Sequence, residues 1–288
     1  MASLRPALDP RLNAFRDDLA VVALKGQVEA PRFVSGRPAH VTVPVTALRR
    51  RPEADGPRDT ELLHGECVSV FDEADGFAWV QSQRDAYVGY VSLDALGTGT
   101  PAPTHRVSAL RSFIYGEPDL KSPMHSWVSL NSPLVVSGTQ GRFSTLAGGG
   151  YVFSDHLSPM DIFAPDYVSI AEQFLETPYL WGGRSSLGLD CSGLVQCALE
   201  AAGIPCPRDT DMQEAALGSA MPDSQPLQRG DLLFWKGHVG IMADGATLLH
   251  ANATHMKTVE EAVEPAIARI AQTDGPVTSV KRLAALSR

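Results

Sequence analysis

The sequence lacks several features that would place it in a common class of protein. No apolar run approaches the ~20 residues of a membrane-spanning helix. Lysine and arginine number 24 against 33 aspartate and glutamate residues, and the net charge of −9 disfavours nucleic acid and anionic membranes as partners. The four cysteines form no C-x-x-C pair of the kind that binds zinc. These absences leave a globular, acidic chain whose few cysteines need another explanation.

The first residues lack the continuous apolar segment of a secretory signal peptide. Residues 1–10 include two prolines, an arginine and an aspartate, and residues 15–19 are highly charged. This composition predicts a cytoplasmic protein, and a reducing compartment suits a free nucleophilic thiol. We expect residues 1–31 to form an N-terminal extension with a short helix over residues 12–24.

Short alternating strands separated by turn residues are predicted from residue 32 to residue 98. The segment Val45–Arg49 recurs as Val107–Arg111, and Gly89–Val91 recurs at nearly the same spacing as Gly150–Val152. Two matches at nearly one spacing predict a duplicated small β-barrel, with a second copy over residues 105–160. The Gly-, Thr- and Pro-rich segment between the copies predicts a linker. The strands predicted in the first copy cover residues 40–43, 66–70, 78–81 and 87–91.

A helix is predicted to begin at Cys191. Asp190 is a good N-cap, apolar residues follow at helical spacing, and Gly203 supplies the stop. A thiol in the first turn of a helix lies at the positive end of the dipole, which commonly lowers a cysteine pKa from about 8.5. Cys191 is therefore a candidate nucleophile, whereas Cys197 and Cys206 are expected to be buried apolar residues of the core.

A cysteine nucleophile needs a base and a group that orients the base. His238 and His250 lie in two predicted strands that meet at a hairpin around Asp244 and Gly245. A two-residue loop would put the histidines on opposite faces, whereas a three-residue loop, residues 243–245, would put them directly opposite each other. The spacing thus permits a Cys–His–His relay, and we expect the two histidines on the same face, with an odd number of loop residues around Asp244 and Gly245.

Several motifs, in the same order along the chain, resemble the NlpC/P60 family of papain-like cysteine peptidases that act on bacterial cell-wall peptides. The resemblance implies that Cys191 is the nucleophile, His238 the base and His250 the orienting residue. It also places Tyr179 beside the active site, and it implies no cofactor and no metal. The matching segments are residues 179–183, 190–194, 229–234, 238–241 and 250–251.

The preceding units each resemble a bacterial SH3 domain. The implied fold is α+β: an SH3-like barrel over residues 32–98, another over residues 105–160, and a papain-like catalytic domain over residues 161–288. The second barrel departs from the pattern, because residues 131–136 stand where Gly65–Val68 stand in the first.

The whole arrangement resembles the γ-D-glutamyl-L-diamino acid endopeptidases of murein-peptide recycling. The implied substrate is the muropeptide L-Ala-γ-D-Glu-(meso-diaminopimelate or L-Lys), cut after D-Glu. Its free amine would be held by Glu66 and Tyr87, with Tyr90 as an alternative to Tyr87. Asp190 and Ser192 would complete that pocket.

The resemblance further assigns Arg208 to the α-carboxylate of D-Glu, where a bidentate pair is favourable. A surface or structural ion pair is an equal alternative for Arg208. For Glu66 the alternative is a solvated turn residue, as most glutamates are, and Asp190 could be a simple N-cap or serve both roles. Other activities also stay open: a peptidoglycan-degrading endopeptidase, an amidase or acyltransferase on the same fold, a non-catalytic wall-binding protein, or a Cys/His₂ zinc site. The sequence gives no oligomeric state.

Overall fold

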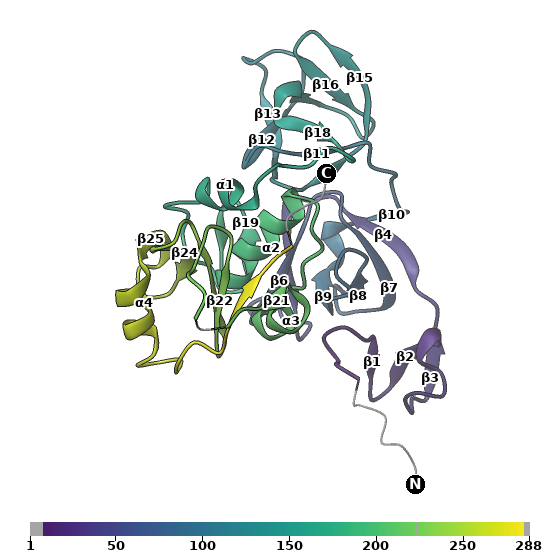
Figure 1. Cartoon of the computed structure of the whole chain (residues 1–288). Coiled ribbons are helices and arrows are strands. Elements are labelled where there is room, and N and C mark those ends of the chain that lie inside the picture. Colours follow the sequence, from purple (N-terminus) through teal and green to yellow (C-terminus); the bar gives the residue numbers. More distant parts are fainter. Residues whose placement is uncertain (1–7, 223, 285–288) are drawn as a thin grey trace. The chain divides into compact units, whose positions relative to one another are not determined.

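The computed structural model describes residues 8–222 and 224–284, and the chain divides into two compact units, Met1–Pro103 and Thr104–Arg288. The division falls within the segment predicted as a linker, whereas the boundary expected at residues 160–161 lies inside the second unit. Figure 1 shows the elements of each unit. Among the described residues, no helix is both long enough and apolar enough to cross a membrane.

The prediction of a helix over residues 12–24 is wrong. This stretch forms two short strands and a single turn of 3-10 helix, and a third strand that begins at Arg32 completes a small sheet in the order β1-β2-β3. Leu19 and Ala20 are both fully buried, and Arg16 stacks on Trp79 and pairs with Asp72, so tertiary contacts override the local helical pattern. Residues 1–7 of the expected extension lie outside the described residues. The bounds are β1 Phe15–Arg16, β2 Leu19–Val21, η1 Val22–Leu24 and β3 Arg32–Val34.

The rest of the first unit is a sheet in the order β10-β4-β7-β8-β9-β5-β6. Each strand predicted here from alternation has a counterpart in the structure, because the apolar side chains of alternate positions are buried, as Val68 and Val70 are in β7. The bounds are β4 Arg37–Val41, β5 Val45–Arg49, β6 Arg58–Leu63, β7 Cys67–Ala74, β8 Phe77–Ser82, β9 Val88–Ser92, η2 Leu93–Ala95 and β10 Leu96–Thr98.

The first part of the second unit repeats this strand order. Its five-stranded sheet runs β13-β12-β17-β16-β15, matching β6-β5-β9-β8-β7. Arg49 pairs with Tyr90 in one sheet and Tyr115 with Tyr151 in the other, each beside a β-bulge. Arg49 therefore corresponds to Tyr115 and not to Arg111, so the pentapeptide match is out of register although the repeated topology is real. The bounds are β11 His105–Val107, β12 Arg111–Tyr115, β13 Met124–Ser129, β14 Pro133–Leu134, β15 Val136–Gln140, β16 Phe143–Leu146, β17 Tyr151–Phe153, η3 Ser154–His156 and β18 Leu157–Pro159.

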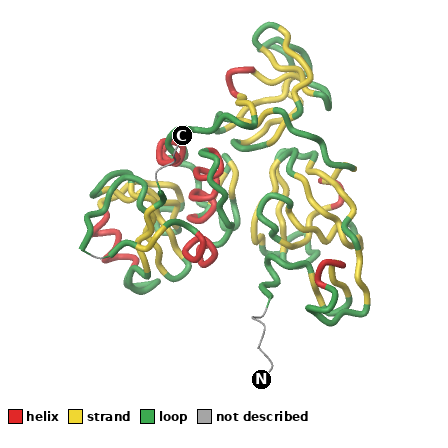
Figure 2. Tube along the Cα trace, turned by 45° about the vertical axis from the view of Figure 1, so that its right-hand side comes forward, coloured by secondary structure: helices red, strands yellow, loops and turns green. Residues whose placement is uncertain are grey.

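The remainder of the second unit packs helices against a sheet in the order β21-β26-β22-β23-β24-β25. The α-helices of the described chain all lie here, where Figure 2 shows them among the strands. Helix α2 is buried along nearly its whole length and packs on β23 and β24. The bounds are α1 Tyr167–Glu172, β19 Arg184–Ser185, β20 Gly188–Leu189, α2 Cys191–Ala201, α3 Thr210–Ala216, β21 Ser219–Ala220, β22 Leu232–Trp235, β23 His238–Met242, β24 Thr247–Asn252, β25 Lys257–Ala262, α4 Val263–Ile270 and β26 Ser279–Arg282.

Candidate active site

Cys191 is the first residue of α2, as the sequence predicted. Asp190 is the N-cap, and its Oδ1 accepts a hydrogen bond from the Gly193 N–H at 2.7 Å. Gly193 cannot carry a side chain, because a Cβ there would lie 2.2 Å from the carbonyl oxygen of Gly183. This close approach holds the loop before the helix against the first turn of α2.

The Cys191 thiol lies at the beginning of β23. Its Sγ is 4.0 Å from the Gly237 carbonyl oxygen and accepts a hydrogen bond from the Val239 N–H, and these two residues flank His238. The side chain of Thr210 forms a further hydrogen bond with the thiol. The Cys191 side chain is buried, and burial and the charge of Asp190 raise the pKa of the Cys191 thiol to about 11. This direction is opposite to the one expected from the helix terminus alone.

His238 and His250 lie on the same face of adjacent antiparallel strands. Met242 pairs with Leu248, so an odd number of residues, 243–247, separates the paired strands. Extended along the strands, this register puts Gly240 opposite His250 and leaves His238 one diagonal step away. The shared face and the odd number of residues are therefore confirmed, whereas the three-residue loop that would have put the histidines directly opposite is wrong. Asp244 sets the longer turn by accepting hydrogen bonds from the N–H groups of residues 246 and 247.

The two histidines are hydrogen-bonded to each other. Nε2 of His238 lies 2.8 Å from Nδ1 of His250, which is fully buried. Burial and the neighbouring His250 lower the pKa of His238 to about 3, and burial also lowers the pKa of His250. Both rings are therefore neutral in the free protein at neutral pH, and His238 is available as a base.

Two further side chains contact His250, and the sequence analysis identified neither. Oε1 of Glu261 lies 2.7 Å from the His250 Nε2, and Nδ2 of Asn252 lies 3.0 Å from the same atom. Arg269 forms an ion pair with Glu261 and donates to the Thr254 hydroxyl at 3.0 Å. The alternation of residues 257–261 could have revealed the strand that carries Glu261, but its register against β24 is a tertiary feature.

Asp190, Ser192 and Arg208 form one buried network. The Arg208 guanidinium donates to the carboxylate of Asp190 at 2.8 Å and to the Ser192 hydroxyl at 2.8 Å, and Arg208 is only 1% exposed. Asp190 also accepts from the Gly182 N–H at 2.9 Å. Arg208 thus forms a buried ion pair and Asp190 is the N-cap, while the substrate-binding roles assigned to both residues remain predictions.

Tyr179 lies beside the nucleophile. Its backbone pairs with Leu189, just before the N-cap of α2, and its ring packs partly buried on the same core as Cys191. Burial and the electrostatic effects of Cys191 and Asp190 raise the pKa of the Tyr179 phenol, so the hydroxyl stays protonated and can donate a hydrogen bond.

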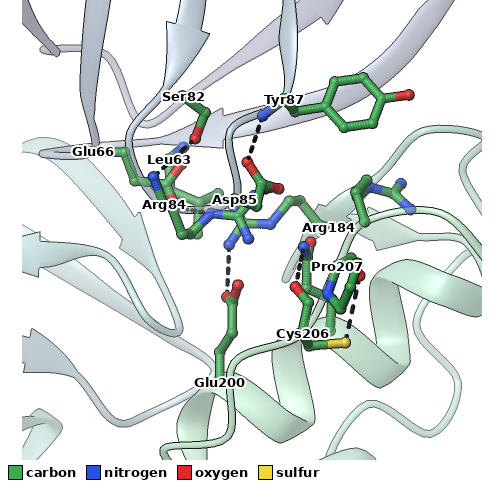
Figure 3. A network of polar contacts seen from close by, with 12 residues as sticks. Leu63, Glu66, Ser82, Arg84, Asp85, Tyr87, Arg184, Glu200, Cys206 and Pro207 are labelled. Atoms are coloured by element: carbon green, nitrogen blue, oxygen red, sulfur yellow. Dashed lines mark hydrogen bonds and ion pairs between the residues drawn. The ribbon is translucent and has the colours of Figure 1, made fainter. Parts of the chain in front are cut away.

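Glu66 and Tyr87, both labelled in Figure 3, belong to the first unit, and both are buried. The Glu66 carboxylate accepts from the Leu63 N–H at 3.0 Å and pairs with Nε of Arg84 at 3.1 Å. Glu66 is thus a buried, paired carboxylate and not a solvated turn residue. The Tyr90 hydroxyl accepts from Arg16 at 3.1 Å. The amine-binding roles assigned to these residues remain predictions.

A buried thiol at a helix N-terminus beside a hydrogen-bonded histidine pair is the arrangement of a cysteine hydrolase. The histidines bond to each other, and among residues 8–222 and 224–284 no three His, Cys, Asp or Glu side chains are grouped as metal ligands. Cys191, His238 and His250 therefore lie together where the first turn of α2 meets β23 and β24.

Comparison with known proteins identifies two domains. Residues 176–271 match the NlpC/P60 family and residues 48–96 match the bacterial dipeptidyl-peptidase SH3 domain. The chain is 30% identical over 224 residues to the γ-D-glutamyl-L-lysine dipeptidyl-peptidase of Bacillus subtilis, covering 69% of this chain and 74% of that protein. It is 28% identical over 228 residues to dipeptidyl-peptidase 6 of Lysinibacillus sphaericus, covering 71% and 84% of the two chains.

Solved structures show the same fold. A crystal structure of an NlpC/P60 family protein from Bacillus cereus superimposes with a TM-score of 0.70 at 19% identity, over 85% of this chain and 99% of that one. The chain belongs to the NlpC/P60 family, and it is a cysteine peptidase that carries an SH3 domain.

Proposed function

We propose that this peptidase hydrolyses the bond between γ-D-Glu and the diamino acid in small cell-wall peptides with a free N-terminal L-Ala, and so acts in murein-peptide recycling. A relative whose match covers 69% of this chain is named for a γ-D-glutamyl-L-lysine substrate. The observation that carries the chemistry is the thiol of Cys191 held between the residues that flank His238, whose ring is bonded to buried His250. We also propose that residues 105–160 are a second SH3 domain, on the basis of the repeated strand order.

The reaction runs through an acyl-thioester on Cys191. The neutral thiol and neutral imidazole are the favoured forms, so His238 takes the thiol proton as the sulfur attacks the γ-carbonyl carbon. His238 then gives that proton to the nitrogen of the departing diamino acid. Water attacks the thioester with His238 again as base, which releases the L-Ala-D-Glu dipeptide and restores the thiol.

We assign Arg208 a structural role in this site, without contact to the substrate. Its guanidinium fixes the Asp190 carboxylate, which in turn caps the helix that carries the nucleophile. The predicted role of Glu66 is to bind the cationic α-amine of L-Ala, and its charge suits that ligand. The cytoplasmic location stays a prediction, which cell fractionation tests.

The test is product analysis by mass spectrometry with a panel of matched peptides. The panel contains L-Ala-γ-D-Glu-L-Lys, the meso-diaminopimelate analogue, their N-acetylated forms and intact peptidoglycan. We expect the free peptides to release the diamino acid and the acetylated forms to react at least 100-fold more slowly, because a buried charge without its partner costs about 3–5 kcal/mol. Glu66→Ala should lose a similar factor on the free peptides and little on the acetylated ones. Equal turnover of free and acetylated peptides would favour a wall-degrading endopeptidase instead.

A further inference from the structure

Three adjacent strands each place one polar side chain along a diagonal on one face of the catalytic sheet. His238 lies on β23, His250 on β24 and Glu261 on β25. His250 pairs with Val259, so Glu261 is two residues beyond it, just as His238 is two residues from the partner of His250 on the other side. Side chains offset in this way are within reach of each other. Nε2 of His238 lies 2.8 Å from Nδ1 of His250, and Nε2 of His250 lies 2.7 Å from Oε1 of Glu261, so the three side chains form one hydrogen-bonded row.

The proton on each ring follows from the carboxylate at the end of the row. The hydrogen bond from His250 holds the pKa of Glu261 below its usual range and Arg269 acts in the same direction, so Glu261 is ionised and can only accept. A carboxylate oxygen 2.7 Å from the His250 Nε2 therefore requires a proton on that nitrogen. Because His250 is neutral, its Nδ1 carries a lone pair and accepts from the Nε2–H of His238. Nδ1 of His238 is then the bare nitrogen that can take a proton.

Asn252 competes for the same ring nitrogen. Its Oδ1 accepts from the His255 N–H at 2.9 Å, which turns its Nδ2 toward the His250 Nε2 at 3.0 Å. An amide N–H needs a lone pair on that nitrogen, whereas Glu261 needs a proton there. A hydrogen bond to an ionised group is roughly twice as strong as a neutral one, so Glu261 prevails while it is present.

We propose that Glu261 is a positioning residue that holds the His250–His238 pair in the one tautomer in which His238 can act as base. The inference rests on the proposed roles of Cys191 and His238 in peptide hydrolysis. Arg269 supports it by fixing the Glu261 carboxylate from helix α4.

Loss of the Glu261 carboxylate should move the proton on each histidine ring from Nε2 to Nδ1. In a Glu261→Ala variant, Asn252 donates to the His250 Nε2, the His250 proton moves to Nδ1, and His238 must accept that proton at its own Nε2. The His238 proton then occupies Nδ1, and no basic nitrogen remains for Cys191. We expect kcat to fall by about 10²- to 10⁴-fold with little change in KM; the upper value is the loss seen in a serine protease whose catalytic histidine is held in the wrong tautomer.

A second substitution should rescue the first. Asn252→Asp in the Glu261→Ala background puts a carboxylate oxygen where Nδ2 stood, 3.0 Å from the His250 ring nitrogen, while its other oxygen still accepts from His255. We expect the double variant to recover at least tenfold in kcat over Glu261→Ala. Glu260→Ala is the matched control, because Glu260 is the exposed neighbour of the same charge, and it should retain wild-type kcat.

The decisive readout is independent of turnover. ¹⁵N NMR of histidine-labelled full-length protein should show Nε2-protonated rings for both His238 and His250 in the wild type and Nδ1-protonated rings in Glu261→Ala. A wild-type His238 protonated at Nδ1 would overturn the proposal even if the peptide is hydrolysed and even if the variant fails to fold. An unrescued loss of activity in a folded double variant would also overturn it. Failure of the wild type to cleave the γ-glutamyl peptide would instead count against the proposed function, and the NMR result would still decide the tautomer.

Discussion

Replacement of Arg208 by methionine distinguishes a structural ion pair from a substrate ligand. Arg208 is 1% exposed and donates to Asp190, to the Ser192 hydroxyl and, at 3.2 Å, to the Gly183 carbonyl oxygen. The variant keeps an unbranched side chain in this space but removes the cation. The Asp190 carboxylate then stays buried with only backbone N–H groups and a hydroxyl as partners.

The expected effect on stability is large. Removal of one partner from a buried ion pair costs about 3–5 kcal/mol, because the other charge is left uncompensated. In a unit of this size each kcal/mol lowers Tm by about 2–4 °C, so the Tm of the second unit should fall by about 6–20 °C. Asp190→Asn should cost less, since asparagine is also a good N-cap, and the double variant should lose less than the sum of the two single variants.

Differential scanning calorimetry of the full chain, together with steady-state kinetics, makes the comparison. Arg229→Met is the matched control, because the Arg229 side chain is 40% exposed and its ion pairs with Asp166 and Glu172 lie at the surface. We expect that control to change the free energy of unfolding by less than about 1 kcal/mol. An Arg208→Met enzyme with an unchanged Tm and a KM raised tenfold or more would refute the ion-pair account and restore Arg208 as the ligand of the substrate carboxylate.

Three further predictions concern the thiol and the imidazole. Cys191→Ala should abolish hydrolysis in a folded protein, while Cys197→Ala should retain most activity. A peptidase assay in which Cys197→Ala is inactive and Cys191→Ala is active would show that Cys191 is not the nucleophile. Because burial raises the pKa of Cys191 to about 11, its alkylation rate by iodoacetamide should keep rising from about pH 7 to pH 10, and a plateau below about pH 8 would show a preformed thiolate–imidazolium pair. Because burial lowers the pKa of His238 from 6.5 to about 3, the folded state binds fewer protons than the unfolded state in that window, so the free energy of unfolding should decrease as pH falls through it; His238→Gln should weaken this dependence in urea titrations.

Local sequence signals predicted the elements that carry the chemistry. The N-cap, the helical spacing after Cys191 and the stop at Gly203 correspond to α2 and its end at Ala201. Short apolar runs bounded by turn residues predicted the strands of His238 and His250, and nearly every position of both strands is buried. These features depend on residues near one another in sequence, where propensity and periodicity carry information.

Features set by distant residues could not be derived in the same way. The pKa of the Cys191 thiol is raised because the thiol is buried, and this effect outweighs that of the helix N-terminus. No local sequence pattern reveals how deeply the thiol is buried. The loop between the histidines was predicted with the right parity and the wrong length, because Asp244 stabilises a wider turn than Gly245 alone suggested. Glu261 was missed because its contact with His250 depends on the register of a strand pair.

The extension before the first SH3 domain shows the same limit. Residues 12–24 carry a plausible helical pattern, yet the contacts of Arg16 with Asp72 and Trp79 and the parallel pairing of β2 with β3 favour strands. Asp72 and Trp79 lie more than 50 residues from Arg16 along the chain, and the pairing of β2 with β3 is a tertiary feature that the local sequence does not reveal.

The central claim, that Cys191 attacks the γ-glutamyl carbonyl, is tested most directly by trapping the acyl-enzyme. Wild-type protein is mixed with L-Ala-γ-D-Glu-L-Lys, quenched in acid within the first turnover, and analysed by intact-protein and peptide mass spectrometry. The account predicts an L-Ala-γ-D-glutamyl thioester on Cys191, release of one free lysine per adduct, and neither product from Cys191→Ala. An adduct on another residue, an acyl group cut at a different bond, or lysine release by the Cys191→Ala variant would contradict it.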